Sequence, residues 1–67
     1  MNRLYLRLFK SETVWYIFTP SSKAIFDGLI KASPDVHIVV YSDDEAPKTI
    51  RLHEIIEVMD EPPPVLR

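Results

Sequence analysis

The sequence contains no cysteine and only one glycine, Gly28, among its 67 residues. Without cysteine, disulfide bonds and cysteine-ligated zinc sites are excluded, and the chain is compatible with a reducing cytosol. A single glycine excludes the glycine-rich loops that hold nucleotide phosphates. The two histidines, His37 and His53, are too few for a histidine-based structural metal site.

Long apolar runs are also missing. The longest run covers residues 14–18, far short of the roughly 20 residues that a membrane-spanning helix needs. Near the N-terminus Arg3, Arg7 and Lys10 interrupt any apolar stretch of the signal-peptide type. We therefore expect a soluble, cytoplasmic protein that does not contact a membrane.

The patterns that mark catalytic sites are absent as well. The chain has no cysteine nucleophile and no G-x-S-x-G motif. Asp43, Asp44 and Glu45 carry oxygen ligands, but without the spacing of a calcium loop they are more typical of a solvated turn. His53 beside Glu54 is an ordinary surface pair in a chain too short for a useful pocket. We expect no enzymatic activity, no cofactor and no metal.

The residues that are present predict one small globular domain. Hydrophobic residues make up 46% of the chain and charged residues 27%, which is a globular composition. A chain of this length buries only about 60% of the surface that its unfolded form exposes, so its stability is marginal. Since disulfides and metals are excluded, association with another chain is the remaining way to add stability.

The charge is unevenly distributed along the chain. Residues 1–33 carry a net charge of +3 and residues 34–67 carry −5, which gives −2 for the whole chain. Such an asymmetry can orient a partner or drive head-to-tail self-association.

Two strands and a helix are predicted in the first half of the chain. Residues 2–9 alternate in polarity, and residues 14–18 are rich in β-branched and aromatic side chains, so the two segments form a hairpin. Thr19 followed by Pro20 can begin a helix that Pro34 ends. Its apolar face consists of Ile25, Phe26, Leu29 and Ile30. Gly28 costs this helix about 1 kcal/mol relative to alanine, which a close approach to the sheet would explain.

The second half predicts two further strands, at residues 35–42 and 48–52, on either side of an acidic loop. The segment that follows, residues 53–60, is ambiguous. We favour a tight turn and a short fifth strand, although a C-terminal helical turn also fits its spacing. Three consecutive prolines make residues 61–67 an extended tail that cannot enter a central strand.

The predicted fold is therefore a single α+β domain at residues 1–60, with a proline-rich tail. Its order is β-β-α-β-β, with one helix packed on one face of a small antiparallel sheet. The expected core residues are Leu4, Leu6, Leu8, Tyr16 or Trp15, Phe18, Ile25, Phe26, Leu29, Ile30, Ile38, Val40, Ile50 and Leu52.

If the leucine face of residues 2–9 meets the helix, the opposite face of the sheet has nothing to cover it. We expect this face to be aromatic and arginine-rich, without carboxylates. The candidate partner-binding residues are Arg3, Tyr5, Arg7, Trp15, His37, Tyr41 and Arg51. The register of residues 14–18 stays open: either Trp15 and Ile17, or Val14, Tyr16 and Phe18, face outward.

Three interpretations of that face compete. Aromatic residues and arginine dominate protein interfaces, and two such faces could also form a homodimer. Stacked bases and phosphates of a single-stranded nucleic acid would use the same residues, but the net acidity and the lack of a basic run disfavour it. In the third interpretation the C-terminal segment covers the face as a second small core. We predict a non-enzymatic protein-binding module, such as a regulator, inhibitor or assembly subunit of bacterial or viral type. The alternative is a nucleic-acid binder.

Overall fold

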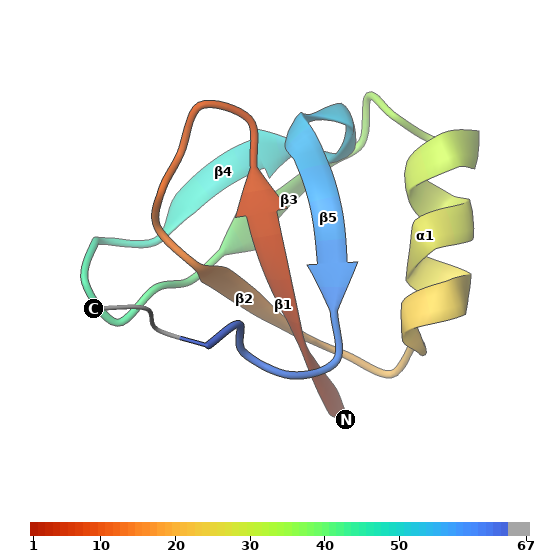
Figure 1. The fold of residues 1–67 in the computed structure, drawn as a ribbon. Helices are drawn as coiled ribbons and strands as arrows, with labels where there is room; N and C mark the ends of the chain where they lie inside the picture. Colours follow the sequence, from red (N-terminus) through yellow and green to blue (C-terminus); the bar gives the residue numbers. More distant parts are fainter. Residues whose placement is uncertain (65–67) are drawn as a thin grey trace.

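The computed structural model describes residues 1–64 and has the α+β architecture expected from the sequence (Figure 1). Five strands, one α-helix and one 3₁₀ turn follow one another in the order β-β-α-β-β-η-β. Their bounds are β1 Asn2–Leu8, β2 Trp15–Thr19, α1 Lys23–Ala32, β3 His37–Val40, β4 Lys48–Arg51, η1 Leu52–Glu54 and β5 Ile55–Met59. Among these described residues no helix is long and apolar enough to cross a membrane.

The strands form two antiparallel sheets that are joined at one point. The first has the order β2-β1-β5 and the second pairs β3 with β4. Tyr16 in β2 and Tyr41, directly after β3, exchange backbone hydrogen bonds of 2.8 and 3.0 Å. The strands therefore follow one continuous path, β5-β1-β2-β3-β4, and β1 is the central strand of the first sheet.

Both sheets contribute side chains to one hydrophobic core. Its buried residues are Leu4, Leu6, Leu8, Trp15, Ile17, Phe26, Val40, Ile50, Leu52, Ile55 and Val58. Only Phe26 comes from the helix, which lies beside β5 (Figure 1). The leucine face of β1 belongs to the same buried cluster as Phe26 of the helix and Val40 and Ile50 of the second sheet. The predicted packing of one helix against the sheet is confirmed, with the helix lying against β5.

The helix also begins later than predicted. Ser22, not Thr19, is its N-cap, and the Ser22 hydroxyl accepts a hydrogen bond from the Ile25 amide at 3.3 Å. Thr19 instead ends β2, where pairing with β1 keeps it extended. Ile25 and Leu29 are 64% and 41% exposed, so their assignment to the core is wrong. A helix placed beside the sheet buries a narrower stripe than a helix lying across it.

Gly28 has a different explanation from the one suggested by the sequence. A Cβ atom at this position would meet nothing within 4 Å, so no close approach to the sheet requires glycine. Gly28→Ala is therefore expected to raise the free energy of unfolding by about 0.8–1 kcal/mol, because alanine loses less backbone entropy in a helix. Urea unfolding would show this as a higher midpoint with an unchanged slope. An unchanged or lower midpoint would contradict the prediction.

The ambiguous segment after β4 forms the turn η1 and the strand β5, as favoured from the sequence. The Glu54 carboxylate accepts the Arg51 amide at 2.8 Å, which ties the turn back onto the end of β4. β5 pairs with β1 through a bulge, so that Leu8 lies opposite Ile55 and Arg7 opposite Glu57. The extra residue lets Ile55 and Val58 both face the core although three positions separate them.

Candidate functional site

The register between β1 and β2 decides which residues form the outer face of the first sheet. Leu6 lies opposite Trp15 and Leu4 opposite Ile17, and all four side chains are buried. The outer face accordingly carries Tyr16 and Phe18, the second of the two registers left open by the sequence. Phe18 is 52% exposed, so its assignment to the core is wrong.

Trp15 was both an alternative core residue and a candidate partner-binding residue, and the structure places it in the core. Its side chain is 1% exposed, and its indole N–H donates a hydrogen bond to the Ser11 hydroxyl at 3.2 Å. The Nζ atom of Lys48 lies 5.0 Å from the centre of the ring. Trp15 therefore supports the fold and presents no surface to a partner.

Five side chains gather on the outer face around Tyr16, and we call them the Tyr16 cluster: Arg3, Tyr5, Tyr16, Phe18 and Tyr41. The rings of Tyr5 and Phe18 meet the Tyr16 ring edge-on, with centroids 6.4 and 5.7 Å away. The Tyr41 ring stacks on it at 6.0 Å, with 29° between the planes. Three strands contribute to the row, since Tyr5 is in β1, Tyr16 in β2 and Tyr41 follows β3.

Arg3 lies over two of these rings. Its Cζ atom is 4.5 Å from the centre of the Tyr16 ring and 4.9 Å from that of Phe18. A guanidinium that contacts rings through its plane keeps the N–H groups at its edge available as donors. Within residues 1–64 Arg3 forms no ion pair, because the ion pairs found there join Arg7 to Glu57 and Lys23 to Asp27.

The surroundings of Arg3 stabilise its charge. Hydrogen bonding with the Tyr5 side chain raises the pKa of Arg3 above its ordinary value, and Tyr5, Tyr16 and Asp43 add electrostatic contributions in the same direction. Arginine is already protonated at every pH at which proteins fold. The Tyr16 cluster therefore contains a permanent cation.

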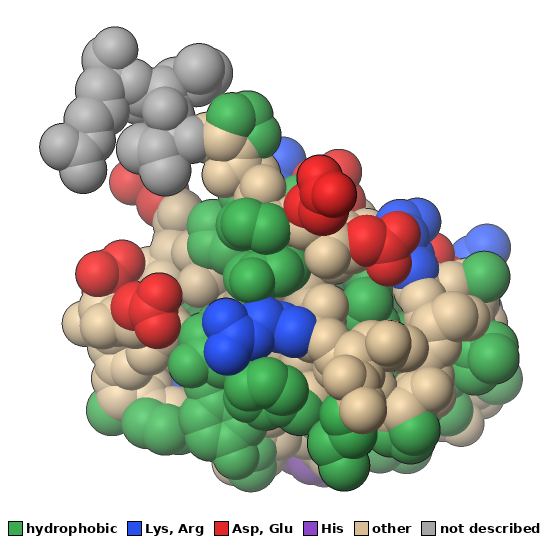
Figure 2. All heavy atoms as spheres, turned by 90° about the horizontal axis from the view of Figure 1, so that it is seen from below, with side chains coloured by type: hydrophobic (Ala, Val, Ile, Leu, Met, Phe, Trp, Pro, Cys, Tyr) green, Lys and Arg blue, Asp and Glu red, His purple; other side chains and the backbone are tan. Residues whose placement is uncertain are grey.

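The cluster is open to solvent. Tyr41 is 40% exposed and Arg3 is exposed, whereas Tyr5 and Tyr16 are half-buried. Figure 2 shows a face on which a basic side chain lies among hydrophobic ones, with acidic side chains around them. Exposed apolar surface that is contiguous and bordered by charge is typical of interaction sites.

Arg7 shares this face but is already paired. Its guanidinium lies 3.2 Å from the Glu57 carboxylate on β5, and both side chains are about half exposed. The expectation of a face without carboxylates is therefore wrong, because β5 pairs with β1 and places Glu57 opposite Arg7. Surface pairs of this kind contribute at most about 1 kcal/mol to stability.

The structure does not bring His37 and Arg51 into the cluster. They lie opposite one another in the second sheet and are exposed there. His37 begins β3, four residues before Tyr41, so it lies at the far end of that strand from Tyr16. Of the seven predicted residues, three belong to the Tyr16 cluster: Arg3, Tyr5 and Tyr41.

A small groove continues from the cluster toward an acidic loop. It has a volume of about 390 Å³, and its lining includes Tyr5, Tyr16, Asp43, Asp44 and Pro63. The Thr13 hydroxyl donates a hydrogen bond to the Glu45 carboxylate, which ties this loop to the connection between β1 and β2. Pro62 and Pro63 thus border the site, and Phe18 and Tyr41 are exposed beside it. Residues 65–67 of the predicted tail lie outside the described residues.

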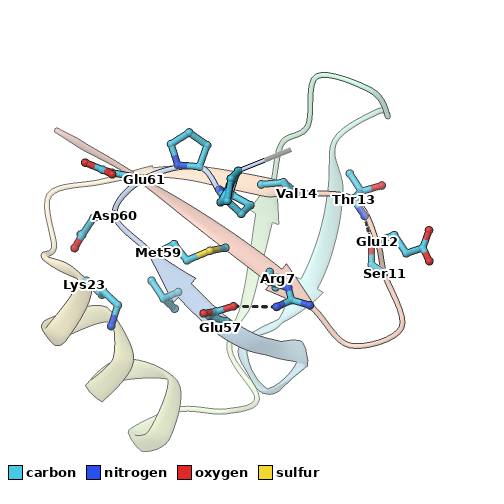
Figure 3. Close-up of a pocket in the computed structure, with 14 residues that line it drawn as sticks. Arg7, Ser11, Glu12, Thr13, Val14, Lys23, Glu57, Met59, Asp60 and Glu61 are labelled. Carbon is cyan, nitrogen blue, oxygen red and sulfur yellow. Dashed lines mark hydrogen bonds and ion pairs between the residues drawn. The ribbon is translucent and has the colours of Figure 1, made fainter. Parts of the chain in front are cut away.

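A larger, open groove of about 1060 Å³ lies between β5, the β1–β2 connection and the prolines (Figure 3). The Arg7–Glu57 ion pair lies in it, and the labelled side chains around it are mostly polar and separate from one another. In the part of the chain that the structure describes, no three His, Asp or Glu side chains converge as a metal site would require. The polar side chains that line this groove therefore do not form one cluster, whereas the side chains of the Tyr16 cluster contact one another.

Comparisons with protein-family models, curated proteins and solved structures found no match for this chain. The function must therefore be argued from the α+β fold and its exposed aromatic cluster. Sequence reasoning missed Tyr16 and Phe18 as site residues. No signal in residues 14–18 could have found them, since all five side chains are apolar or aromatic and either face of the strand can be buried.

Proposed function

We propose that this chain is a small, non-enzymatic protein-binding module that acts through the Tyr16 cluster. The observation that carries the proposal is the guanidinium of Arg3 lying over the half-buried Tyr16 ring and the exposed Phe18 ring. Tyrosine and arginine are among the residues that contribute most to binding energy in protein interfaces. The absence of cysteine supports a role in the cytoplasm, as a regulator, inhibitor or assembly subunit.

The cluster is also ordered before any partner arrives. Three rings and one guanidinium contact Tyr16, so its side chain has little freedom left to lose. Immobilising a mobile side chain on binding costs about 0.5–1.5 kcal/mol. A pre-ordered aromatic surface avoids much of that cost, which supports a binding role over a purely structural one.

The nucleic-acid alternative has less support from the same geometry. A groove that follows a phosphate backbone needs several cations in a row. Of the two arginines on the outer face of the first sheet, Arg7 is paired with Glu57. Asp43 and Asp44 line the groove beside Tyr16 and would repel phosphates.

The test is affinity capture from a cell lysate, split into nuclease-treated and untreated halves, with mass spectrometry of the bound proteins. We expect at least one protein to be retained in both halves by the unmodified chain. Arg3→Glu and Phe18→Ala, both at exposed positions, should reduce its recovery about tenfold or more, as for the loss of an interface hot spot.

Lys31→Glu is the matched control for Arg3→Glu, because it makes the same charge change at an exposed position on α1. It should leave capture unchanged. Equal capture by the unmodified chain and the Arg3→Glu variant would refute the proposed role of the cluster. Loss of all bound proteins after nuclease treatment would favour the nucleic-acid alternative.

A further inference from the structure

The charges around the Tyr16 cluster are arranged in a definite order along β2. At one end Arg3 lies opposite Phe18, and in the middle Tyr5 lies opposite Tyr16, which in turn bridges to Tyr41. Because β3 runs antiparallel to β2, the residues after Tyr41 return alongside the start of β2. The Arg3 guanidinium thus lies over the Tyr16 and Phe18 rings, and the acidic loop lies on the other side of Tyr16, beyond the start of β2.

The acidic end is formed by Asp43 and Asp44. Both line the groove that also includes Thr13, Val14 and Tyr16, which places them beyond the start of β2. The Ser42 hydroxyl accepts the Asp44 amide at 3.1 Å and so orders the loop. Neither aspartate forms an ion pair within residues 1–64. Asp43 acts on Arg3 of the same chain only at a distance, as the smallest of the influences on it.

A surface of this kind is complementary to itself. In a two-fold symmetric interface each residue of one copy meets the partner residue of the other, and the reverse contact forms as well. A two-fold axis that passes between the Arg3 guanidinium and the acidic loop would bring Arg3 of each copy onto Asp43 of the other. We propose that the Tyr16 cluster binds a second copy of this chain in such an antiparallel homodimer. This inference rests on the proposed function and names the partner.

The dimer gives Arg3 a carboxylate partner and covers the exposed rings of the cluster. Each Arg3 guanidinium, which forms no ion pair within residues 1–64, receives a carboxylate from the other copy, an acceptor that arginine favours for paired hydrogen bonds. The half-exposed rings of Phe18 and Tyr41 become buried against the other copy. A domain of this size has a small core, and burying further apolar area by association is a common way to stabilise it.

The overall charge distribution agrees with this arrangement. Arg3 belongs to the half of the sequence with a net charge of +3, whereas Asp43 and Asp44 belong to the half with −5. A parallel arrangement of two copies would place like charges together, whereas the antiparallel one places opposite charges together. Charge complementarity therefore selects the orientation, and the aromatic rings provide the buried area.

The test uses sedimentation velocity and equilibrium on the full 67-residue chain and two variants. The first variant is Arg3→Glu, and the second is Asp43→Lys combined with Asp44→Lys. All these positions are exposed, and circular dichroism with thermal melting confirms that each variant folds. The unmodified chain should dimerise. In each variant alone both symmetric charge contacts become repulsive, which should raise the dimer dissociation constant about 10- to 100-fold.

An equimolar mixture of the two variants is the decisive sample. In the mixed dimer both charge contacts are attractive again: one is the original pairing of Arg3 with Asp43 and Asp44, and in the other the signs are exchanged. Dimerisation should therefore return to nearly the level of the unmodified chain. Only a self-complementary interface with Arg3 against Asp43 and Asp44 predicts this rescue. Lys31→Glu, whose site lies on α1, should dimerise like the unmodified chain.

A monomeric unmodified chain at high concentration would overturn the homodimer, as would dimers that both variants leave unaffected or a mixture that stays monomeric. The proposed function is judged separately. If the chain is monomeric but Arg3→Glu still abolishes capture of another protein, the binding module stands and only the second copy is excluded. If neither self-association nor capture depends on the cluster, both proposals fail.

Discussion

Trp15→Ala is expected to leave most of the chain unfolded at room temperature. Trp15 is 1% exposed and packs in the only core cluster found in residues 1–64, together with Leu6 across the strand pair. Replacing a buried tryptophan by alanine costs about 3–5 kcal/mol. The core of a domain this small rarely supplies more than about 3–5 kcal/mol of net stability. One substitution therefore removes nearly all of it.

Phe18→Ala is the matched control, because Phe18 is an aromatic residue in the same strand whose side chain is about half exposed. It should change the free energy of unfolding by about 1 kcal/mol or less. Chemical denaturation followed by far-ultraviolet circular dichroism measures both variants. If Phe18→Ala unfolded the chain and Trp15→Ala did not, the register of β2 described above would be wrong.

Val58→Asp is expected to have an equally severe effect through a different cause. Val58 lies opposite Leu6 in the pairing of β5 with β1 and is 4% exposed. A carboxylate there would have no cationic partner in an apolar core, and burying an unpaired charge is among the most destabilising of single changes. We expect more than about 4 kcal/mol of lost stability, and therefore an unfolded chain.

Ile56→Asp makes the same type of change two residues away, at a side chain that is 58% exposed beside the bulge. This variant should stay folded, with a thermal midpoint close to that of the unmodified chain. The pair also separates the two interpretations of residues 53–60. In a helix Ile56 would lie on the apolar face and Val58 would not, so the opposite ranking of the two variants would support a helical turn.

The Trp15→Ala and Val58→Asp variants should also lose binding, because both residues lie in the sheet that carries the Tyr16 cluster. Trp15 and Val58 lie under the outer face, on the strands that flank or carry Tyr5 and Tyr16. Their loss should abolish binding by unfolding the sheet, whereas Arg3→Glu and Phe18→Ala should abolish binding in a folded chain. Measuring stability and binding on the same samples separates the two causes.

Local sequence patterns determined most of the secondary structure of this protein and part of its candidate site. Alternation in residues 2–9 predicts β1, and the β-branched and aromatic residues of segment 14–18 predict β2. The segment between the first hairpin and Pro34 contains α1, although tertiary pairing extended β2 to Thr19 and delayed the helix to Lys23. Three candidate site residues could also be predicted from the sequence: Arg3, Tyr5 and Tyr41. Alternation in β1 alone places Arg3 and Tyr5 on the face opposite the leucines.

Only the tertiary structure decided the register of β2 and the neighbour of Arg7. In residues 14–18 both faces of the strand are apolar, so Trp15 enters the core only because Leu6 pairs with it. Glu57 reaches Arg7 because β5 pairs with β1 across fifty positions of sequence. Local propensity specifies each strand, but the choice between its two faces depends on contacts with residues far away in the chain. For this protein that choice positions Tyr16 and Phe18 beneath Arg3, and with them the proposed binding site.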